Sequence, residues 1–173
     1  MPQRQITHVP AESYKYQSAF MVPTPLADFL MAADGTRVVL VTGVFDVLHQ
    51  EHLVFLEKAK ELGDVLVVCI ESDVRVRQIK GPDRPHFSEF ERKHHLDELE
   101  IADMVVILPD EFSQPLHHQT FISQIQPDFL AVSSHTAHLD KKQAIMSLHG
   151  GKVVVVHEHN PDESTSQLLS RSS

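Results

Sequence analysis

The sequence has little cysteine and no long apolar run. Its single cysteine, Cys69, argues against a disulfide framework and a cysteine-based metal cluster within these 173 residues. Cys69 lies inside an apolar run, which predicts a buried strand residue. No stretch approaches the roughly 20 consecutive apolar residues of a membrane-spanning helix, and the N-terminus lacks a basic region followed by an apolar core. We therefore expect a cytoplasmic protein with no membrane partner.

Basic residues are also scarce. The chain carries 15 Lys and Arg against 24 Asp and Glu, which gives a formal net charge of -9 at pH 7. An excess of negative charge disfavours nonspecific binding to nucleic acid, because its backbone is anionic. We therefore expect no nucleic-acid partner, and any anionic substrate would need a local basic site.

Several nucleotide-binding and catalytic fingerprints are missing. Neither the glycine-rich turn of dinucleotide-binding folds nor the Gly-Lys-Ser/Thr phosphate loop occurs in the sequence. No serine stands in a nucleophile elbow, and Cys69 has no obvious activating base. These absences argue against dehydrogenases, P-loop ATPases and covalent acyl transferases, and they leave noncovalent phosphate chemistry.

Apolar segments and amphipathic helices alternate from residue 37 onward. Candidate strands are 37–42, 65–70, 104–107, 129–132 and 152–156. Short apolar strands that alternate with helices predict an α/β fold with five parallel strands covered on both faces. Helices are predicted at 26–31, 50–62, 88–99 after a Ser88–Glu91 capping box, 139–148, and from Ser164 onward. We treat 1–36 as an N-terminal extension and 37–173 as one domain.

The segment 41–52, VTGVFDVLHQEH, predicts a buried strand, a tight turn and the start of a helix. His49 and His52 are three positions apart, so both are expected on one face of that helix. Helix N-termini attract anions, and imidazole can donate to phosphoryl oxygens or transfer a proton near neutral pH. Capping and packing are the alternative roles for the two histidines. Ligands of parallel sheets bind beyond the carboxyl ends of the strands, where this segment falls.

Residues 43–52, GVFDVLHQEH, resemble the Gly-x-Phe-Asp-x-x-His-x-Gly-His motif of the cytidylyltransferase-like nucleotidyltransferases. Further matching segments follow in the order and spacing of that family, and they are ESD at 71–73, KGPDRP at 80–85, SEFER at 88–92 and STS at 164–166. The resemblance covers about residues 37–171. It is greatest to the adenylyltransferase domain of bifunctional heptose synthesis enzymes and to glycerol-3-phosphate and phosphoethanolamine cytidylyltransferases.

This resemblance implies a doubly wound, Rossmann-like fold and the transfer of a nucleotidyl group from CTP or ATP to a small phosphorylated acceptor, with release of pyrophosphate. By position in the motifs, His49, His52 and Lys80 would be catalytic, Gly43, Val44, Phe45, Ser164, Thr165 and Ser166 would bind the nucleotide, and Arg92 and Arg84 would bind the acceptor phosphate. Mg2+ would accompany the triphosphate, with no metal site built by the protein. Relatives are often dimers, so a homodimer is the expected assembly.

Two walls of the expected site depart from the family pattern. Glu51 replaces the motif glycine between the two histidines, where a side chain takes up space and a carboxylate repels phosphate. The same carboxylate would stabilise the start of the helix. After the fourth strand, Ser133, Ser134 and His135 replace a glycine and an acidic residue, although the Ser133 hydroxyl can still bind a nucleotide.

These departures leave two hypotheses of different classes. The first is an active nucleotidyltransferase with altered nucleotide or acceptor preference. The second is a noncatalytic paralogue that binds a nucleotide, a sugar phosphate or a protein partner. A metal-binding role for the 13 histidines is a third alternative. Adjacent helical histidines argue against it, because their side chains diverge by about 100 degrees.

Overall fold

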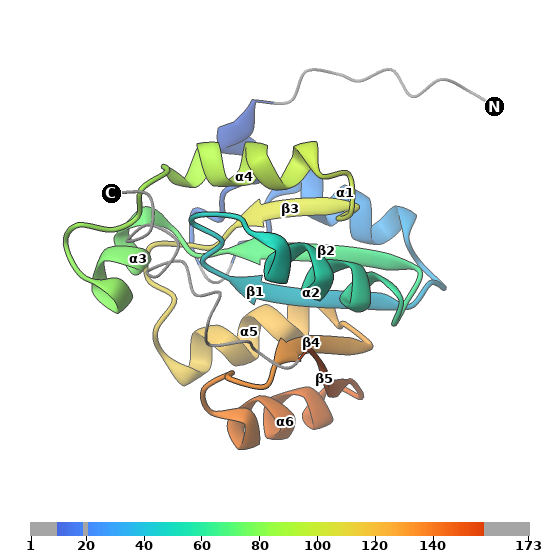
Figure 1. The fold of residues 1–173 in the computed structure, drawn as a ribbon. Helices are drawn as coiled ribbons and strands as arrows, with labels where there is room; N and C mark the ends of the chain where they lie inside the picture. Colours follow the sequence, from blue (N-terminus) through green and yellow to red (C-terminus); the bar gives the residue numbers. More distant parts are fainter. Residues whose placement is uncertain (1–9, 19–20, 158–173) are drawn as a thin grey trace.

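The strands of this chain form one five-stranded parallel sheet. The computed structural model describes residues 10–18 and 21–157. The strands are β1 (Val38–Gly43), β2 (Val65–Ile70), β3 (Met104–Ile107), β4 (Phe129–Ser133) and β5 (Lys152–His157). Their order in the sheet is β3-β2-β1-β4-β5 (Figure 1). The chain therefore builds outward from β1 in one direction and then crosses to β4, which makes the gap between β1 and β4 the point where strand order reverses.

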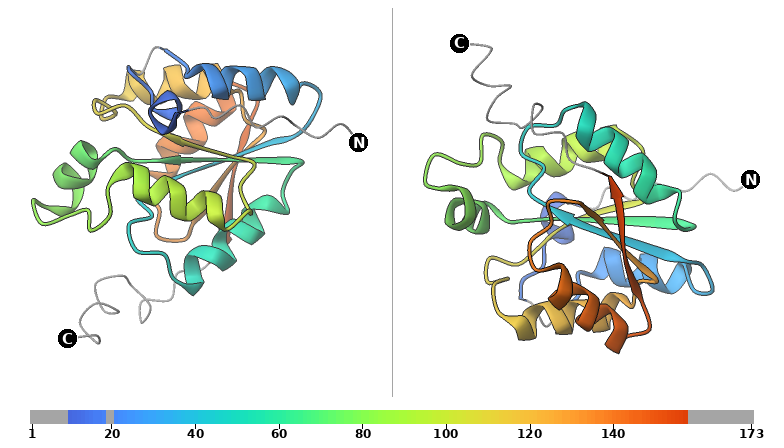
Figure 2. Two further views of the ribbon diagram at one scale, coloured as in Figure 1. Left: turned by 90° about the horizontal axis from the view of Figure 1, so that it is seen from above. Right: turned by 60° about the horizontal axis from the view of Figure 1, so that its bottom comes forward.

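Six α-helices of the described residues flank this sheet. They are α1 (Thr24–Ala32), α2 (Gln50–Lys60), α3 (Asp73–Lys80), α4 (Glu89–Glu98), α5 (Pro115–Ile125) and α6 (Leu139–Leu148), preceded by a 3-10 helix at Ala11–Tyr14. Helices α2 and α4 cover one face, and α1, α5 and α6 cover the other (Figure 2). Alternate residues of β1 supply the two cores, with Leu40 on the α5 side and Val41 on the α2 side. The predicted α/β fold with helices on both faces is thus confirmed.

Local signals explain where two of the helices begin and end. Ser88 accepts from the Glu91 N–H while the Glu91 carboxylate accepts from the Ser88 N–H, which is the predicted capping box of α4. Helix α2 begins at Gln50, so His49 is its N-cap residue and precedes the first turn. Gly63 follows α2 where the chain turns into β2, and a Cβ there would lie 2.7 Å from the Arg37 carbonyl oxygen. The predicted helix from Ser164 lies outside the described residues.

Part of the N-terminal region packs against the domain. The Tyr16 N–H donates to the Ile107 carbonyl at 2.9 Å, so residues around Tyr16 pair with edge strand β3. Tyr16 and Leu26 are fully buried in the core on the α5 side. Lys15 Nζ donates to Glu89 Oε1 at 2.7 Å and thereby ties this segment to the start of α4.

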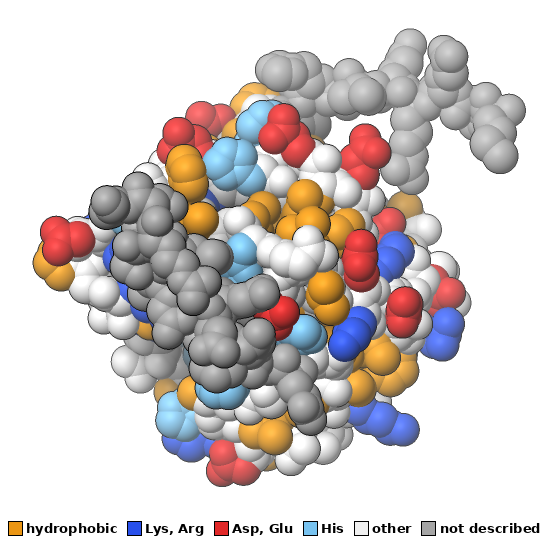
Figure 3. Space-filling model, viewed as in Figure 1, with side chains coloured by type: hydrophobic (Ala, Val, Ile, Leu, Met, Phe, Trp, Pro, Cys, Tyr) orange, Lys and Arg blue, Asp and Glu red, His pale blue; other side chains and the backbone are white. Residues whose placement is uncertain are grey.

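The surface carries no broad basic area on the side that Figure 3 displays. Acidic, basic and hydrophobic side chains of the described residues are interspersed there. This face agrees with the net charge of -9, which indicates that an anionic ligand needs a local basic site. No helix of the described ranges is long and apolar enough to cross a membrane.

Candidate functional site

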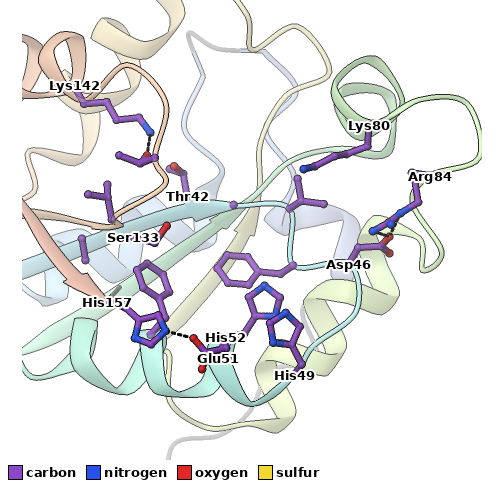
Figure 4. A pocket seen from close by; sticks show the side chains of 17 residues that line it. Thr42, Asp46, His49, Glu51, His52, Lys80, Arg84, Ser133, Lys142 and His157 are labelled. Carbon is purple, nitrogen blue, oxygen red and sulfur yellow. Dashed lines mark hydrogen bonds and ion pairs between the residues drawn. The ribbon is translucent and has the colours of Figure 1, made fainter. Parts of the chain in front are cut away.

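A polar cavity of about 400 Å³ opens where strand order reverses, between the ends of β1 and β4 (Figure 4). The predicted site residues that line it are Gly43, Val44, Phe45, His49, His52, Lys80, Arg84 and Ser133. These residues come from the β1–α2 turn, the end of α3, the loop that follows α3, and the end of β4. Segments up to 90 residues apart in the sequence thus meet at the predicted edge of the sheet.

The two motif histidines stand together at the N-terminus of α2. Their ring centroids are 4.0 Å apart, and the Phe45 ring lies 5.3 Å from that of His52. Phe45 adopts a left-handed backbone conformation with φ 49°, which turns the chain sharply from β1 toward the helix. Two imidazoles therefore face the cavity at the start of a helix, where the positive end of the helix stabilises an anion.

Gly43 ends β1 and lies against the Phe45 ring. A Cβ at this position would lie 2.6 Å from the Phe45 ring, which is closer than side-chain atoms approach each other. The absence of a side chain lets Phe45 fold back over the strand end. This close approach explains the motif glycine at the floor of the cavity.

Asp46 braces the cavity rim rather than facing a ligand. Its carboxylate accepts from Arg84 Nε at 2.7 Å and from the backbone N–H groups of His86 at 2.9 Å and Phe87 at 3.0 Å. Burial alone would raise the pKa of Asp46, but the Phe87 and His86 N–H groups and the Arg84 charge hold it below its usual range. The loop that carries Arg84, directly after Lys80, is thereby fixed against the β1–α2 turn.

Arg92 lies beneath the same turn and does not line the cavity. Its guanidinium is fully buried and donates from Nη1 to the Val44 carbonyl at 2.7 Å. It also donates from Nη2 to Asp73 at 2.8 Å and from Nε to the Phe87 carbonyl at 3.0 Å. The structure thus places Arg92, expected at the acceptor phosphate, as a link between the turn, α3 and α4.

Glu51 turns away from the two histidines and pairs with His157 at the end of β5 (Figure 4). The side chains are only 18% and 11% exposed, so the contact is largely sheltered from water. A register shift between Val132 and Ser133 aligns Ser133 with His157, and this irregularity sets the position of His157 beside α2. The carboxylate that replaces the motif glycine is therefore on the cavity wall with a partner.

Lys142 of α6 and Thr42 of β1 also line the cavity, although the sequence did not single them out. Lys142 donates to Thr136 Oγ1, and burial lowers the pKa of its ammonium group. The helical pattern of 139–148 predicted α6, but no sequence signal showed which way Lys142 points. Lys142 reaches the cavity because α6 lies beside the end of β4.

Other expected residues fall elsewhere. Ser134 and His135 are exposed, whereas Ser133 lines the cavity. Ser164, Thr165 and Ser166 lie outside the described residues. Within residues 10–18 and 21–157, no group of three or more His, Cys, Asp or Glu side chains could hold a metal ion.

The doubly wound sheet has a polar cavity at its switch point, which is where open α/β sheets bind their ligands. Known proteins narrow this class of α/β protein. The sequence matches the cytidylyltransferase-like family model over residues 40–170, so the chain belongs to that family of nucleotidyltransferases. The matched range contains the motif histidines, Lys80 and Ser164.

Similar proteins agree with this assignment. The chain is 33% identical over 160 residues to the Bifunctional protein HldE of Syntrophotalea carbinolica, a match that covers 91% of this chain and 31% of that protein. It is 44% identical over 96 residues to the Bifunctional protein HldE of Nitratiruptor sp., which covers 56% and 20% respectively. The crystal structure of the lipopolysaccharide core biosynthesis protein from Thermoplasma volcanium has a TM-score of 0.58 and 27% identity, over 73% of this chain and 98% of that one. The chain thus spans a third or less of the curated relatives just named.

Proposed function

We propose that this chain transfers a nucleotidyl group from CTP or ATP to a small phosphorylated acceptor and releases pyrophosphate. The observation that carries the proposal is the convergence of His49, His52 and Lys80 on one cavity at the switch point of the sheet. Lys142 adds a fourth donor from the opposite side of that cavity. A triphosphate placed there meets donors on several sides.

The reaction needs no covalent enzyme intermediate. A phosphate oxygen of the acceptor attacks the α-phosphorus of the nucleotide, the bond to the bridging β-phosphate oxygen breaks, and pyrophosphate leaves with that electron pair. His49 and His52 donate to the α-phosphate as negative charge accumulates on it, and Lys80 stabilises the departing phosphates. Catalysis of this kind is electrostatic, which suits rigid donors at a helix start.

The remaining expected residues take supporting roles in this proposal. The backbone of 43–45 and the hydroxyl of Ser133 bind the nucleotide, joined by Ser164, Thr165 and Ser166 of the matching motif. Arg84, which the resemblance places at the acceptor phosphate, pairs with Asp46 at the cavity rim and holds its loop there. Arg92 acts through its hydrogen bonds to Val44 and Phe87, which position the turn and the Arg84 loop.

Mg2+ fits this site as a companion of the triphosphate. The Asp46 carboxylate, which lines the cavity, is engaged by Arg84 and by two backbone N–H groups. Mg2+ is often held mainly by substrate phosphates and water, with few protein carboxylates. Bound in that way, it would neutralise part of the phosphate charge.

The pairing of Glu51 with His157 bears on which hypothesis holds. An unpaired carboxylate about 4 Å from a phosphate charge costs about 1 kcal/mol in water and several times more in a partly buried site. His157 holds the carboxylate on the wall and offsets its charge, which favours an active enzyme. The same pair narrows the cavity, which favours the alternative of a noncatalytic nucleotide- or sugar-phosphate-binding protein.

The test is pyrophosphate release with Mg2+, CTP or ATP, and a panel of phosphomonoesters. We expect turnover by the natural chain that falls about 100-fold or more in His49→Ala, as for loss of one transition-state donor. His94→Ala is the matched control, because His94 is an exposed histidine of α4 that pairs with Glu98 at 3.4 Å and does not line the cavity. Turnover by Glu51→Gly alone would favour the noncatalytic alternative for the natural chain. No turnover by either form would refute the proposal.

A further inference from the structure

A second cavity, of about 640 Å³, lies on the other face of the sheet between α5 and α6. It shares two lining residues, Thr42 and Lys142, with the cavity that holds the motif histidines. The end of β1 therefore separates two adjoining spaces. Two adjoining spaces suit a transfer between two substrates. The acceptor's phosphate must reach the α-phosphate of the nucleotide, and the rest of the acceptor then needs a separate space.

The walls of the second cavity are mainly apolar. They include Phe112, Phe121, Ile122, Leu130, Ile145 and Met146. Phe112 packs edge-on against Phe121 at 5.3 Å and against His118 at 4.4 Å. Burial lowers the pKa of His118, so near neutral pH this ring adds to the uncharged aromatic surface. A ligand rich in hydroxyl groups would lose its hydrogen bonds to water here and find few replacements.

Charge is concentrated where the two cavities meet. Lys142 is half-buried at that junction, and Lys141 also lines the second cavity. Glu71 is the acidic residue of this wall, with Arg75 Nε 3.8 Å from its Oε2. Burial raises the pKa of Glu71, while the charges of Arg75, Arg92 and Lys142 act in the opposite direction. The junction therefore suits a phosphate, and the space beyond it suits an apolar group.

We propose that the acceptor is a phosphomonoester with an apolar body, whose phosphate sits at Lys142 and whose body fills the cavity between α5 and α6. This inference rests on the proposed transferase function and names the substrate class of that site. It differs from the polyhydroxylated sugar phosphates to which the resemblance points. The cavity volume lies within the range of roughly 300 to 1,000 Å³ found for small-molecule sites.

Calorimetric titration of the full chain tests this directly, with phenyl phosphate and glucose 1-phosphate as probes. Both carry one phosphate, so they differ chiefly in the body. We expect phenyl phosphate to bind at least about tenfold more tightly, since burial of a ring is worth a few kcal/mol and buried hydroxyls without partners oppose binding. Equal affinity, tighter binding of glucose 1-phosphate, or no binding of phenyl phosphate would overturn the inference.

Three variants locate the probe. Lys142→Gln should weaken phenyl phosphate about tenfold, because one charge-assisted hydrogen bond is lost. Ala144→Phe should weaken it as well, since Ala144 is an exposed lining residue of α6 and a ring there fills the entrance. Lys58→Gln is the control, because Lys58 is an exposed lysine of α2 away from both cavities. Equal loss in all three variants would contradict the placement.

The two proposals fail in different ways. If phenyl phosphate binds as expected and no pyrophosphate is released, the transfer reaction is wrong and the ligand class of the cavity is supported. If pyrophosphate is released with sugar phosphates and not with apolar phosphomonoesters, the transfer reaction is supported and the acceptor class is wrong.

Discussion

Glu51 is the residue by which this chain departs from the family at the catalytic motif, and His157 is its partner. Glu51 replaces a glycine that leaves room for a nucleotide, and its carboxylate is held by the imidazole at the end of β5. A single substitution in the motif would place an uncompensated charge near the triphosphate. In this chain the His157 imidazole offsets the charge of the Glu51 carboxylate. The effects of the two residues on nucleotide binding should therefore be coupled.

We predict that His157→Ala weakens ATP or CTP binding about five- to tenfold, because the Glu51 carboxylate loses a partner that offsets its charge and repels phosphate more strongly. Glu51→Gly should strengthen binding about tenfold for the converse reason. In the double variant the loss of His157 should have little effect, so its affinity should match that of Glu51→Gly within about twofold. Calorimetry on the four proteins measures this cycle, and independent, additive effects would show that the pair does not act as a unit.

Asp46 provides a residue-scale prediction for stability. Asp46→Asn should lower the free energy of unfolding at pH 7 by about 2 kcal/mol, because charge-assisted hydrogen bonds to Arg84 and two backbone N–H groups are weakened. Since the folded pKa of Asp46 is depressed, this contribution is present above its unfolded value of about 3.9 and is lost as pH falls through the folded pKa.

Denaturant titrations between pH 3 and pH 7 measure that difference. Asp83→Asn is the matched control, because Asp83 is an exposed carboxylate of the same loop. The gap between the natural protein and Asp46→Asn should be constant above about pH 6 and should shrink below about pH 4. A gap that is independent of pH would argue against a charged Asp46 as its source.

At the scale of elements, Glu51 stabilises helix α2 although its carboxylate opposes nucleotide binding. Glu51 lies in the first turn of α2, where a carboxylate interacts favourably with the positive end of the helix, and it contacts β5 through His157. Glycine at this position would lose both interactions and add backbone entropy to the unfolded chain. Stability and affinity should thus change in opposite directions.

Glu51→Gly should accordingly reduce the free energy of unfolding by about 2 kcal/mol while it tightens nucleotide binding. Glu57→Gly on the exposed side of the same helix reports glycine propensity alone and should cost about 1 kcal/mol. Chemical denaturation of both variants gives the comparison. A larger loss in Glu57→Gly would show that neither the helix start nor His157 stabilises Glu51.

The β1–α2 turn also depends on α4, through Arg92. Lysine cannot reproduce three hydrogen bonds in separate directions, so Arg92→Lys should cost about 3 kcal/mol of stability. Arg77→Lys, on the exposed side of α3, should be nearly neutral. Thermal and denaturant unfolding check both, and a neutral Arg92→Lys would remove Arg92 as a support of the turn.

At the scale of the whole molecule, most of the fold could be predicted from the sequence. Apolar runs located all five strands of the described residues, because strands buried on both faces need continuous apolar side chains. Helices α3 and α5 were not predicted individually. Helix α3 is short and buries only Val76. The burial of Tyr16 and Leu26 was also not predicted, because it depends on contacts with β3 and α5 that lie far along the chain.

The site could be predicted only in part, for a physical reason. Motif residues near one another in sequence, such as His49 and His52, do line one cavity, although His49 precedes α2 as its N-cap instead of lying in its first turn. Arg92 was expected at the cavity and lies beneath the turn, whereas Lys142 was not expected there and lines the cavity. The direction of a helical side chain depends on how its helix packs, which the sequence alone does not show. The Glu51 contact to His157 joins residues 106 positions apart, so no local pattern could reveal it.

The most direct test of the transferase proposal is a 31P NMR spectrum of the natural chain incubated with Mg2+, ATP or CTP, and a mixture of phosphomonoesters. The account predicts that pyrophosphate and a new phosphoanhydride signal appear together and in equal amounts, because each transfer makes one of each. Release of nucleoside monophosphate with pyrophosphate, or a spectrum that does not change from that of His49→Ala, would contradict it.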